Sequence, residues 1–233
     1  PPGFAITLPK ITTPVHVAAL ARACDEFERV HGLPAGSLRI ELMVETTQSI
    51  FADHATVALP RLVAEGGGRV IGLHFGPYDY TANLAITAAE QRLQHPACDF
   101  ARHVMQVALA GSAVRLSDGP TNVMPIGPHR AGASQVLPDA QRAENAAVVH
   151  RAWRLHVADI RHSLAHGFYQ GWDLHPAQLP TRYAAVYAFF LEGMDAASDR
   201  LRNFVASAAR ATLVGDVFDD AATGQGLLNY FLR

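Results

Sequence analysis

Short apolar runs alternate with longer segments of helical periodicity along this chain, and this alternation constrains its fold more than any other feature. Runs of this kind have the length and apolar content of buried strands. They cover residues 4–8, 39–44, 70–75, 113–116 and 171–174. Such an alternation is typical of βα units built around a parallel sheet. The sequence therefore predicts an α/β protein with a parallel sheet.

The segments between these runs have apolar residues at helical spacing. Residues 14–30 are typical, because Val17, Leu20 and Cys24 recur on one face of a helix there. Further helices are predicted over residues 49–64, 97–110, 141–166 and, as one or two helices, 181–211. Residues 118–138 are rich in Gly and Pro and are predicted to form a long loop above the sheet.

The number of predicted strands suggests which kind of α/β fold the chain belongs to. A (β/α)8 barrel typically has eight strands and about 250 residues. We therefore interpret the chain as a single domain: the last five βα units of a (β/α)8 TIM-type barrel over residues 1–180, followed by a C-terminal helical tail over residues 181–233. Residues 1–3 lead straight into a strand, so we expect earlier strands to precede this sequence.

The composition of the chain excludes some classes of binding partner. The chain has 19 basic and 21 acidic side chains and no long run of either sign, which does not fit a nucleic-acid or membrane-surface binder. No segment reaches the roughly 18 consecutive apolar residues of a membrane span. Two cysteines, Cys24 and Cys98, are too few for a disulfide framework. We expect a cytoplasmic protein that acts on a small molecule.

Two carboxylates stand where predicted strands end. Glu45 follows the run 39–44, and Asp79 comes shortly after the run 70–75, one βα unit later. On a parallel barrel both would lie at the carboxyl end of neighbouring strands, where barrel enzymes keep their active sites. Their oxygens would suit Mg²⁺ or Mn²⁺ and leave positions open for substrate. The alternative is a role at the start of the following helix, with Asp79 capping a helix that opens near Thr81 and Glu45 lying in the first turn before Ser49.

Several motifs in order resemble one known family. They are Leu8-Pro9-Lys10-Ile11, Val44-Glu45-Thr46, Gly76-Pro77-Tyr78-Asp79, Gly167-Phe168, Gly171 and Leu174-His175-Pro176-Ala177-Gln178. This series is similar to the late-barrel motifs of the HpcH/HpaI aldolase and citrate lyase beta-subunit family. The resemblance implies that Glu45 and Asp79 bind a divalent cation, usually Mg²⁺. It also implies that the cation holds an oxo-acid and stabilises the enolate formed as a carbon–carbon bond breaks or forms.

A further segment lies near the end of the chain. Gly215-Asp216-Val217-Phe218-Asp219 resembles a Gly-x-Met-Ile-Asp segment of the acyl-CoA lyases in this family. The resemblance implies a homo-oligomer in which Asp219 acts as an acid/base in the active site of a neighbouring subunit. An aspartate in a loop or helix cap is the alternative. The substrate class stays open between oxo-acids and CoA thioesters, and the family's substrate-binding arginine belongs to an earlier strand.

Other functions compete with this interpretation. Lys10, the only lysine, follows the first predicted strand, where a Schiff-base aldolase would need one. A catalytically silent barrel subunit or scaffold is a third hypothesis, because a fold does not fix a function.

Four other polar residues are predicted to lie outside the site. His162 and His166 share a helix face but lack the glutamate of a zinc-protease helix, so we predict surface histidines. His74 is predicted to be a buried histidine with its hydrogen bonds satisfied. Asp118 is predicted to lie in a Gly-Pro turn outside the core site.

Overall fold

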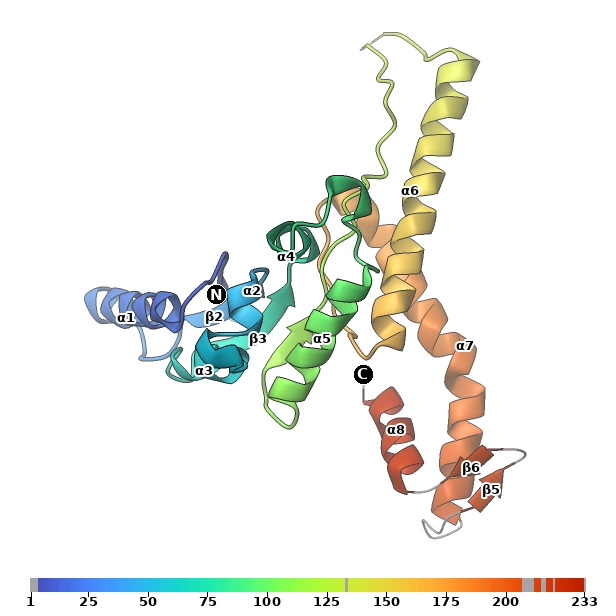
Figure 1. Ribbon diagram of the computed structural model, residues 1–233. Coiled ribbons are helices and arrows are strands. Elements are labelled where there is room, and N and C mark those ends of the chain that lie inside the picture. The colour runs from blue at the N-terminus through green and yellow to red at the C-terminus, as the bar shows by residue number, and fades with distance from the viewer. Residues whose placement is uncertain (1–3, 133, 207–211, 215–216, 220, 233) are drawn as a thin grey trace. The chain divides into compact units, whose positions relative to one another are not determined.

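The computed structural model describes residues 4–132, 134–206, 212–214, 217–219 and 221–232. The chain divides into two compact units, residues 1–178 and 179–233, and Figure 1 shows the elements of each. The first unit contains β1 (Ala5–Leu8), α1 (Pro14–His31), β2 (Arg39–Val44), α2 (Thr47–Ile50), η1 (Asp53–Ala55), α3 (Leu59–Ala64), β3 (Val70–Phe75), α4 (Pro77–Asn83), η2 (Ala88–Glu90), α5 (Pro96–Leu109), β4 (Arg115–Ser117), α6 (Asp139–Ala165) and η3 (Pro176–Gln178).

The sheet of the first unit has four parallel strands in the order β1-β2-β3-β4. Leu8 pairs with Leu42, Leu42 with Leu73, and Leu73 with Leu116, so one row of leucines crosses all four strands in register. Strands in sequence order that pair in parallel need a crossover between each pair. Four of the five predicted strands and their parallel arrangement are therefore confirmed.

The fifth predicted strand, over residues 171–174, is wrong. Gly171 makes only a single parallel bridge to Asp118, and the Asp118 backbone N–H donates to the Gln170 carbonyl at 2.9 Å. Pro120 follows closely and has no N–H to donate to a ladder. We attribute the absence of a longer strand to this early end of the partner segment.

The predicted helix over residues 49–64 is also wrong as one element. The chain forms α2, η1 and α3 instead, and His54 and Ala55 between them have positive φ values of 59° and 56°. Phe51 and Val57 pair in an antiparallel bridge across this turn. Left-handed residues cannot continue a right-handed helix, so the apolar periodicity of the segment is shared by two short helices.

Helix boundaries elsewhere follow local chemistry. The Thr13 side chain accepts from the Val15 N–H at the start of α1, and Gly32 ends that helix with φ of 63°. The predicted helices over 14–30, 97–110 and 141–166 are confirmed as α1, α5 and α6 within two residues at each end. The described part of 118–138 is irregular, as predicted.

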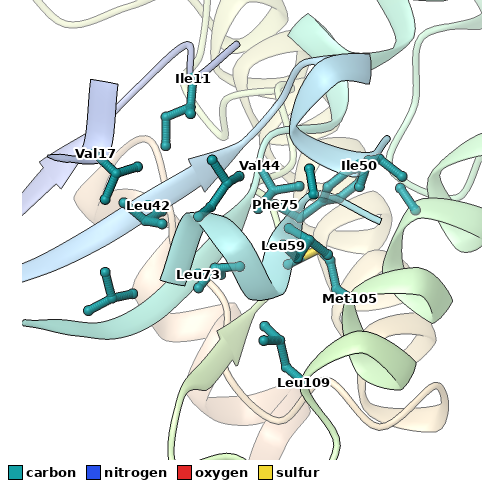
Figure 2. Close-up of a cluster of buried hydrophobic side chains, with 14 of the residues drawn as sticks. Ile11, Val17, Leu42, Val44, Ile50, Leu59, Leu73, Phe75, Met105 and Leu109 are labelled. Atoms are coloured by element: carbon teal, nitrogen blue, oxygen red, sulfur yellow. The ribbon is translucent and has the colours of Figure 1, made fainter. Parts of the chain in front are cut away.

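The core of the first unit lies between the sheet and helices α1, α3 and α5. Leu42, Leu73 and Phe75 from the strands are fully buried, and Leu59 of α3 and Met105 of α5 pack into the same cluster. Figure 2 shows these side chains gathered together. The helices therefore cover this face of the sheet.

The second unit contains α7 (Leu179–Ala206), the antiparallel strands β5 (Thr212–Val214) and β6 (Val217–Asp219), and α8 (Ala221–Phe231). Within it, the Tyr230 hydroxyl of α8 donates to the Phe190 carbonyl of α7, and their rings lie 5.4 Å apart. The predicted terminal helix is α7, over the described part of its range. Among the described residues, no helix is both long and apolar enough to cross a membrane.

Replacing a leucine of the central row tests the packing. Leu42→Ala is expected to lower the free energy of unfolding by about 2–5 kcal/mol, because a fully buried side chain would leave a cavity in a close-packed core. Urea denaturation measures the change. Val107→Ala, at a side chain that is 81% exposed, is the control and should change stability little. Equal effects of the two substitutions would contradict this placement of the core.

Candidate metal centre

Glu45 follows β2 directly and is held from two sides. It is only 5% exposed, and its Oε1 accepts from the Lys10 backbone N–H at 2.6 Å. A Cβ added to Gly76 would lie 2.5 Å from the Glu45 Cβ and 2.8 Å from its Oε2. The loop after β3 therefore packs directly against Glu45, and only a glycine leaves space for the carboxylate there.

Asp79 lies in the first turn of α4, one strand further along the sheet. Its side chain is 51% exposed, and its Oδ1 accepts from the Lys10 Nζ at 2.7 Å. Lys10 follows β1 and has a φ of 51°, which non-glycine residues seldom adopt. Lys10 thus reaches both acids, Glu45 through its backbone and Asp79 through its side chain, and joins the ends of three neighbouring strands.

The helix-capping alternative does not describe either acid. The N-cap of α2 is Thr46, whose side chain accepts from the Ser49 N–H at 3.1 Å. Helix α4 begins at Pro77, earlier than the capping interpretation requires, and has no side-chain cap. Asp79 is inside its first turn, where a carboxylate interacts favourably with the helix dipole. Glu45 and Asp79 are therefore free of capping bonds and available for another role.

The electrostatics of this group favour a cation. Burial raises the pKa of Glu45, the Lys10 N–H lowers it, and the neighbouring Asp79 charge raises it again, with a net increase. The hydrogen bond to Asp79 raises the pKa of Lys10 above its ordinary value. Because two acids lie close together with one partly desolvated, positive charge is stabilised between them. In this structure the Lys10 ammonium supplies part of that charge.

The donor set fits a hard divalent cation. Glu45 and Asp79 offer carboxylate oxygens, the ligands that Mg²⁺ and Mn²⁺ prefer, and Mg²⁺ is commonly held by one or two carboxylates plus water or substrate. Asp79 is exposed, so substrate oxygens could reach an ion held there. The arrangement can thus bind a cation and leave coordination positions open.

The loop after β4 packs against the site from the next strand. The Tyr78 hydroxyl donates to the Pro120 carbonyl at 3.0 Å and accepts from the Asn122 N–H at 2.9 Å. A Cβ on Gly119 would lie 2.3 Å from the Pro77 Cδ. Burial raises the pKa of Tyr78, so its hydroxyl stays protonated. These contacts fix the start of α4, and with it Asp79.

Asp118 pairs with a buried arginine, a role beyond that of the turn residue that the sequence predicts. It is fully buried, accepts from the Arg102 Nη1 at 3.0 Å through both oxygens, and accepts from the Ser163 hydroxyl at 2.6 Å. Arg102 is also fully buried. Sequence reasoning missed this arginine, because an Arg within an amphipathic helix pattern gives no signal that a buried acid will pair with it.

The structure partly agrees with the prediction for His74 and corrects the prediction for His162 and His166. The His74 Nε2 pairs with Glu41 at 2.9 Å, while its buried Nδ1 has no hydrogen-bond partner among the described residues. His162 and His166 are half-buried, so the prediction of surface histidines is wrong. They are enclosed because α5 packs beside them: the His162 Nε2 lies 2.7 Å from the Asp99 Oδ1. Asp219 ends β6, but its side chain lies outside the described part of the chain.

Comparisons with known proteins agree with this fold. A family model described as a domain of unknown function (DUF6986) matches residues 1–233. The chain belongs to this family. A search of curated proteins found no match.

Several solved enzyme structures have a fold similar to that of this chain. A citrate lyase from Burkholderia xenovorans LB400 is similar with a TM-score of 0.68 and 20% identity, over 98% of this chain and 62% of that one. A malate synthase from Haloferax volcanii, in a lead(II) complex, has a TM-score of 0.55 and 17% identity, over 96% of this chain and 58% of that one. This chain thus spans about three fifths of either enzyme, and at these identities the likeness concerns the fold.

Two single substitutions should shift the pKa of Glu45 in opposite directions. In metal-free protein, Asp79→Asn should lower it, because a neighbouring negative charge is removed, whereas Lys10→Met should raise it, because the ammonium is lost and the backbone N–H stays. Carboxyl ¹³C NMR during a pH titration measures both. Glu65→Gln, at the C-cap of α3, is the control. No shift with either substitution would mean that the three groups are not close in solution.

Proposed function

We propose that this chain is the later part of a (β/α)8-barrel enzyme that binds Mg²⁺ or Mn²⁺ through Glu45 and Asp79. The enzyme would cleave or form a carbon–carbon bond in an oxo-acid or acyl-CoA-derived substrate. The observation that carries the proposal is the meeting of Glu45 and Asp79 at one edge of the parallel sheet, joined by Lys10.

Each residue would have a distinct part in this chemistry. A bound divalent cation supplies a Lewis acid that stabilises enolate charge. Glu45, buried and fixed by the Lys10 N–H, would hold its oxygens in one position. Asp79, exposed at the start of α4, would complete the pair from the open side, where substrate enters. The Tyr78 contacts to the loop after β4 would keep that entrance in place.

Similar proteins support the class of reaction. The fold is shared with a citrate lyase and a malate synthase. The same malate synthase has been solved with magnesium and glyoxylate, and with pyruvate and acetyl-CoA, each with a TM-score of 0.50 and 16% identity to this chain. These matches cover 77% and 96% of this chain, and 43% and 60% of those chains. The motif resemblance to the HpcH/HpaI aldolase and citrate lyase beta-subunit family supports the same class.

The Schiff-base alternative is less compatible with the geometry. An imine-forming lysine needs an unprotonated amine, which proteins obtain by desolvation. Lys10 is instead 66% exposed and ion-paired with Asp79 at 2.7 Å, and this contact raises its pKa. The ammonium form is therefore stabilised, which favours a role as a counter-charge over one as a nucleophile.

Metal removal tests the proposal in the full-length protein. A panel of oxo-acids and CoA thioesters should be turned over only with Mg²⁺ or Mn²⁺ present, and chelation should abolish turnover because the enolate charge loses its stabiliser. Mn²⁺ binding, followed by electron paramagnetic resonance, should weaken at least about tenfold in Glu45→Gln and in Asp79→Asn, by analogy with losses around other metal sites. Glu65→Gln should bind normally.

Other outcomes would favour the alternatives. Turnover that survives chelation and is trapped by borohydride at Lys10 would establish the Schiff-base mechanism. A folded protein that binds no Mn²⁺ and turns over nothing in the panel would support a silent barrel subunit.

Asp219 is proposed to act as an acid/base across a homo-oligomer. Asp219→Asn should then lower turnover while Mn²⁺ affinity stays nearly unchanged, because a proton-transfer group is lost but both ligands remain. Mixing Asp219→Asn subunits with Glu45→Gln subunits should restore part of the activity. In verified mixed oligomers, an absence of recovery would show that Asp219 does not serve a neighbouring site. Activity in a monomeric protein would also show that Asp219 does not serve a neighbouring site.

A further inference from the structure

Helices α5 and α6 bring together three side chains that can ligate a metal, on elements that do not carry Glu45 or Asp79. They are Asp99 of α5, His162 near the end of α6, and His166 at its C-cap. One ligand atom from each lies within 4.8 Å of the others, and this is the one such group of three in the described part of the chain. All three residues are partly buried. The sequence presents only the two histidines as neighbours, since the carboxylate comes from another helix.

The spacing of the histidines suits a shared ion. Residues four apart lie on one face of a helix, and the rings of His162 and His166 are 4.1 Å apart between centroids. His162 is in the last turn of the 27-residue helix α6 and His166 is its C-cap, where the helix dipole favours a cation. Two imidazoles and a carboxylate are among the ligands that zinc takes.

The metal-free hydrogen bonding of His162 leaves its Nε2 directed at a carboxylate. This atom lies 2.7 Å from the Asp99 Oδ1 and 3.2 Å from the Arg102 Nη2. The Arg102 Nη2 donates its two protons to the Leu93 carbonyl at 3.1 Å and to the Asp99 Oδ1 at 2.5 Å, so the His162 Nε2–H donates to Asp99. A divalent ion would displace this proton and bind between the imidazole and the carboxylate.

His166 is already set in the tautomer that a metal requires. Its Nδ1 lies 2.8 Å from the His162 backbone carbonyl. A carbonyl only accepts, so Nδ1 carries a proton, and in the neutral imidazole Nε2 then carries the lone pair. An Nδ1–H bonded to a backbone carbonyl is the arrangement that orients histidine ligands in metal sites.

The local charge also allows a divalent ion. Arg102 lies next to the group, but it is paired with the fully buried Asp118 at 3.0 Å as well as with Asp99 at 2.5 Å. Two carboxylates against one guanidinium leave an excess of one negative charge. Burial acts to raise the pKa of Asp99, but the bonds from Arg102 and His162 outweigh it and the pKa is lowered. Asp99 is therefore an ionised ligand.

We propose that Asp99, His162 and His166 form a binding site for a first-row divalent transition-metal ion, with Zn²⁺ as its representative and water at the fourth position. Mixed nitrogen and oxygen donors favour such ions over Mg²⁺, which prefers oxygen alone. An ion about 2 Å from each ligand would draw the three side chains together and tie α5 to the end of α6. This site is independent of the proposed chemistry at Glu45 and Asp79.

The test uses tag-free protein, treated with chelator and dialysed, and carrying Glu45→Gln and Asp79→Asn so that the other carboxylate pair cannot contribute. Calorimetric titration with zinc chloride should show one equivalent bound. Adding His166→Ala or His162→Ala should weaken zinc binding at least about tenfold, as expected when a metal site loses a supporting group. His150→Ala, at an exposed histidine on the same helix, is the matched control and should leave binding unchanged.

Circular dichroism identifies any variant that fails to fold. His166→Ala carries the most weight, because the His166 Nδ1 bonds its own helix backbone, whereas His162 also contacts Arg102. X-ray absorption of the zinc-bound parent gives a readout that needs no ligand substitution, with two imidazole nitrogens expected at about 2.0–2.1 Å. Absence of stoichiometric zinc binding in the parent would overturn the proposal. So would affinity unchanged in folded His166→Ala, or a zinc environment without imidazole.

Discussion

The parallel register of β1, β2 and β3 is the constraint on which the candidate metal centre depends. Leu8, Leu42 and Leu73 lie in one row, so the residues that follow each strand emerge at the same edge of the sheet. The fully buried Leu42 and Leu73 fix this register, because a slip of one residue would turn every apolar side chain to the opposite face. Glu45 and the start of α4 are therefore positioned by the packing of leucines that lie several residues earlier in the strands.

The two clusters of ligating side chains differ in chemistry and in how they are built. Glu45 and Asp79 offer only oxygens and lie beside an exposed lysine, an arrangement suited to a hard cation with open positions. Asp99 and the histidines of α6 offer nitrogen and oxygen between two helices, an arrangement suited to a transition metal. The buried pair of Arg102 and Asp118 lies next to the second cluster and at the end of β4, so it links helix α5 to the sheet.

Most elements whose pattern depends on neighbouring residues are predicted correctly, but a strand that depends on a distant partner is not, and one local helix prediction fails as well. The strands before Glu45 and Asp79 were found from short apolar runs, and α1 from its periodicity. The segment 171–174 also looked like a strand, but its partner is interrupted by Pro120 and only one bridge forms. The helix predicted over 49–64 failed for a local reason that composition hides, the left-handed backbone near His54.

The sequence by itself determined the alternation of strands and helices, the strand-end positions of Glu45 and Asp79, and the likeness of their motifs to a known family, because each depends on residue type and spacing. Only the tertiary structure decided that Lys10 joins both acids and that Asp99 meets the histidines of α6. These contacts join segments 35 to 69 residues apart. Their geometry is set by packing between elements, which no pattern within a single element encodes.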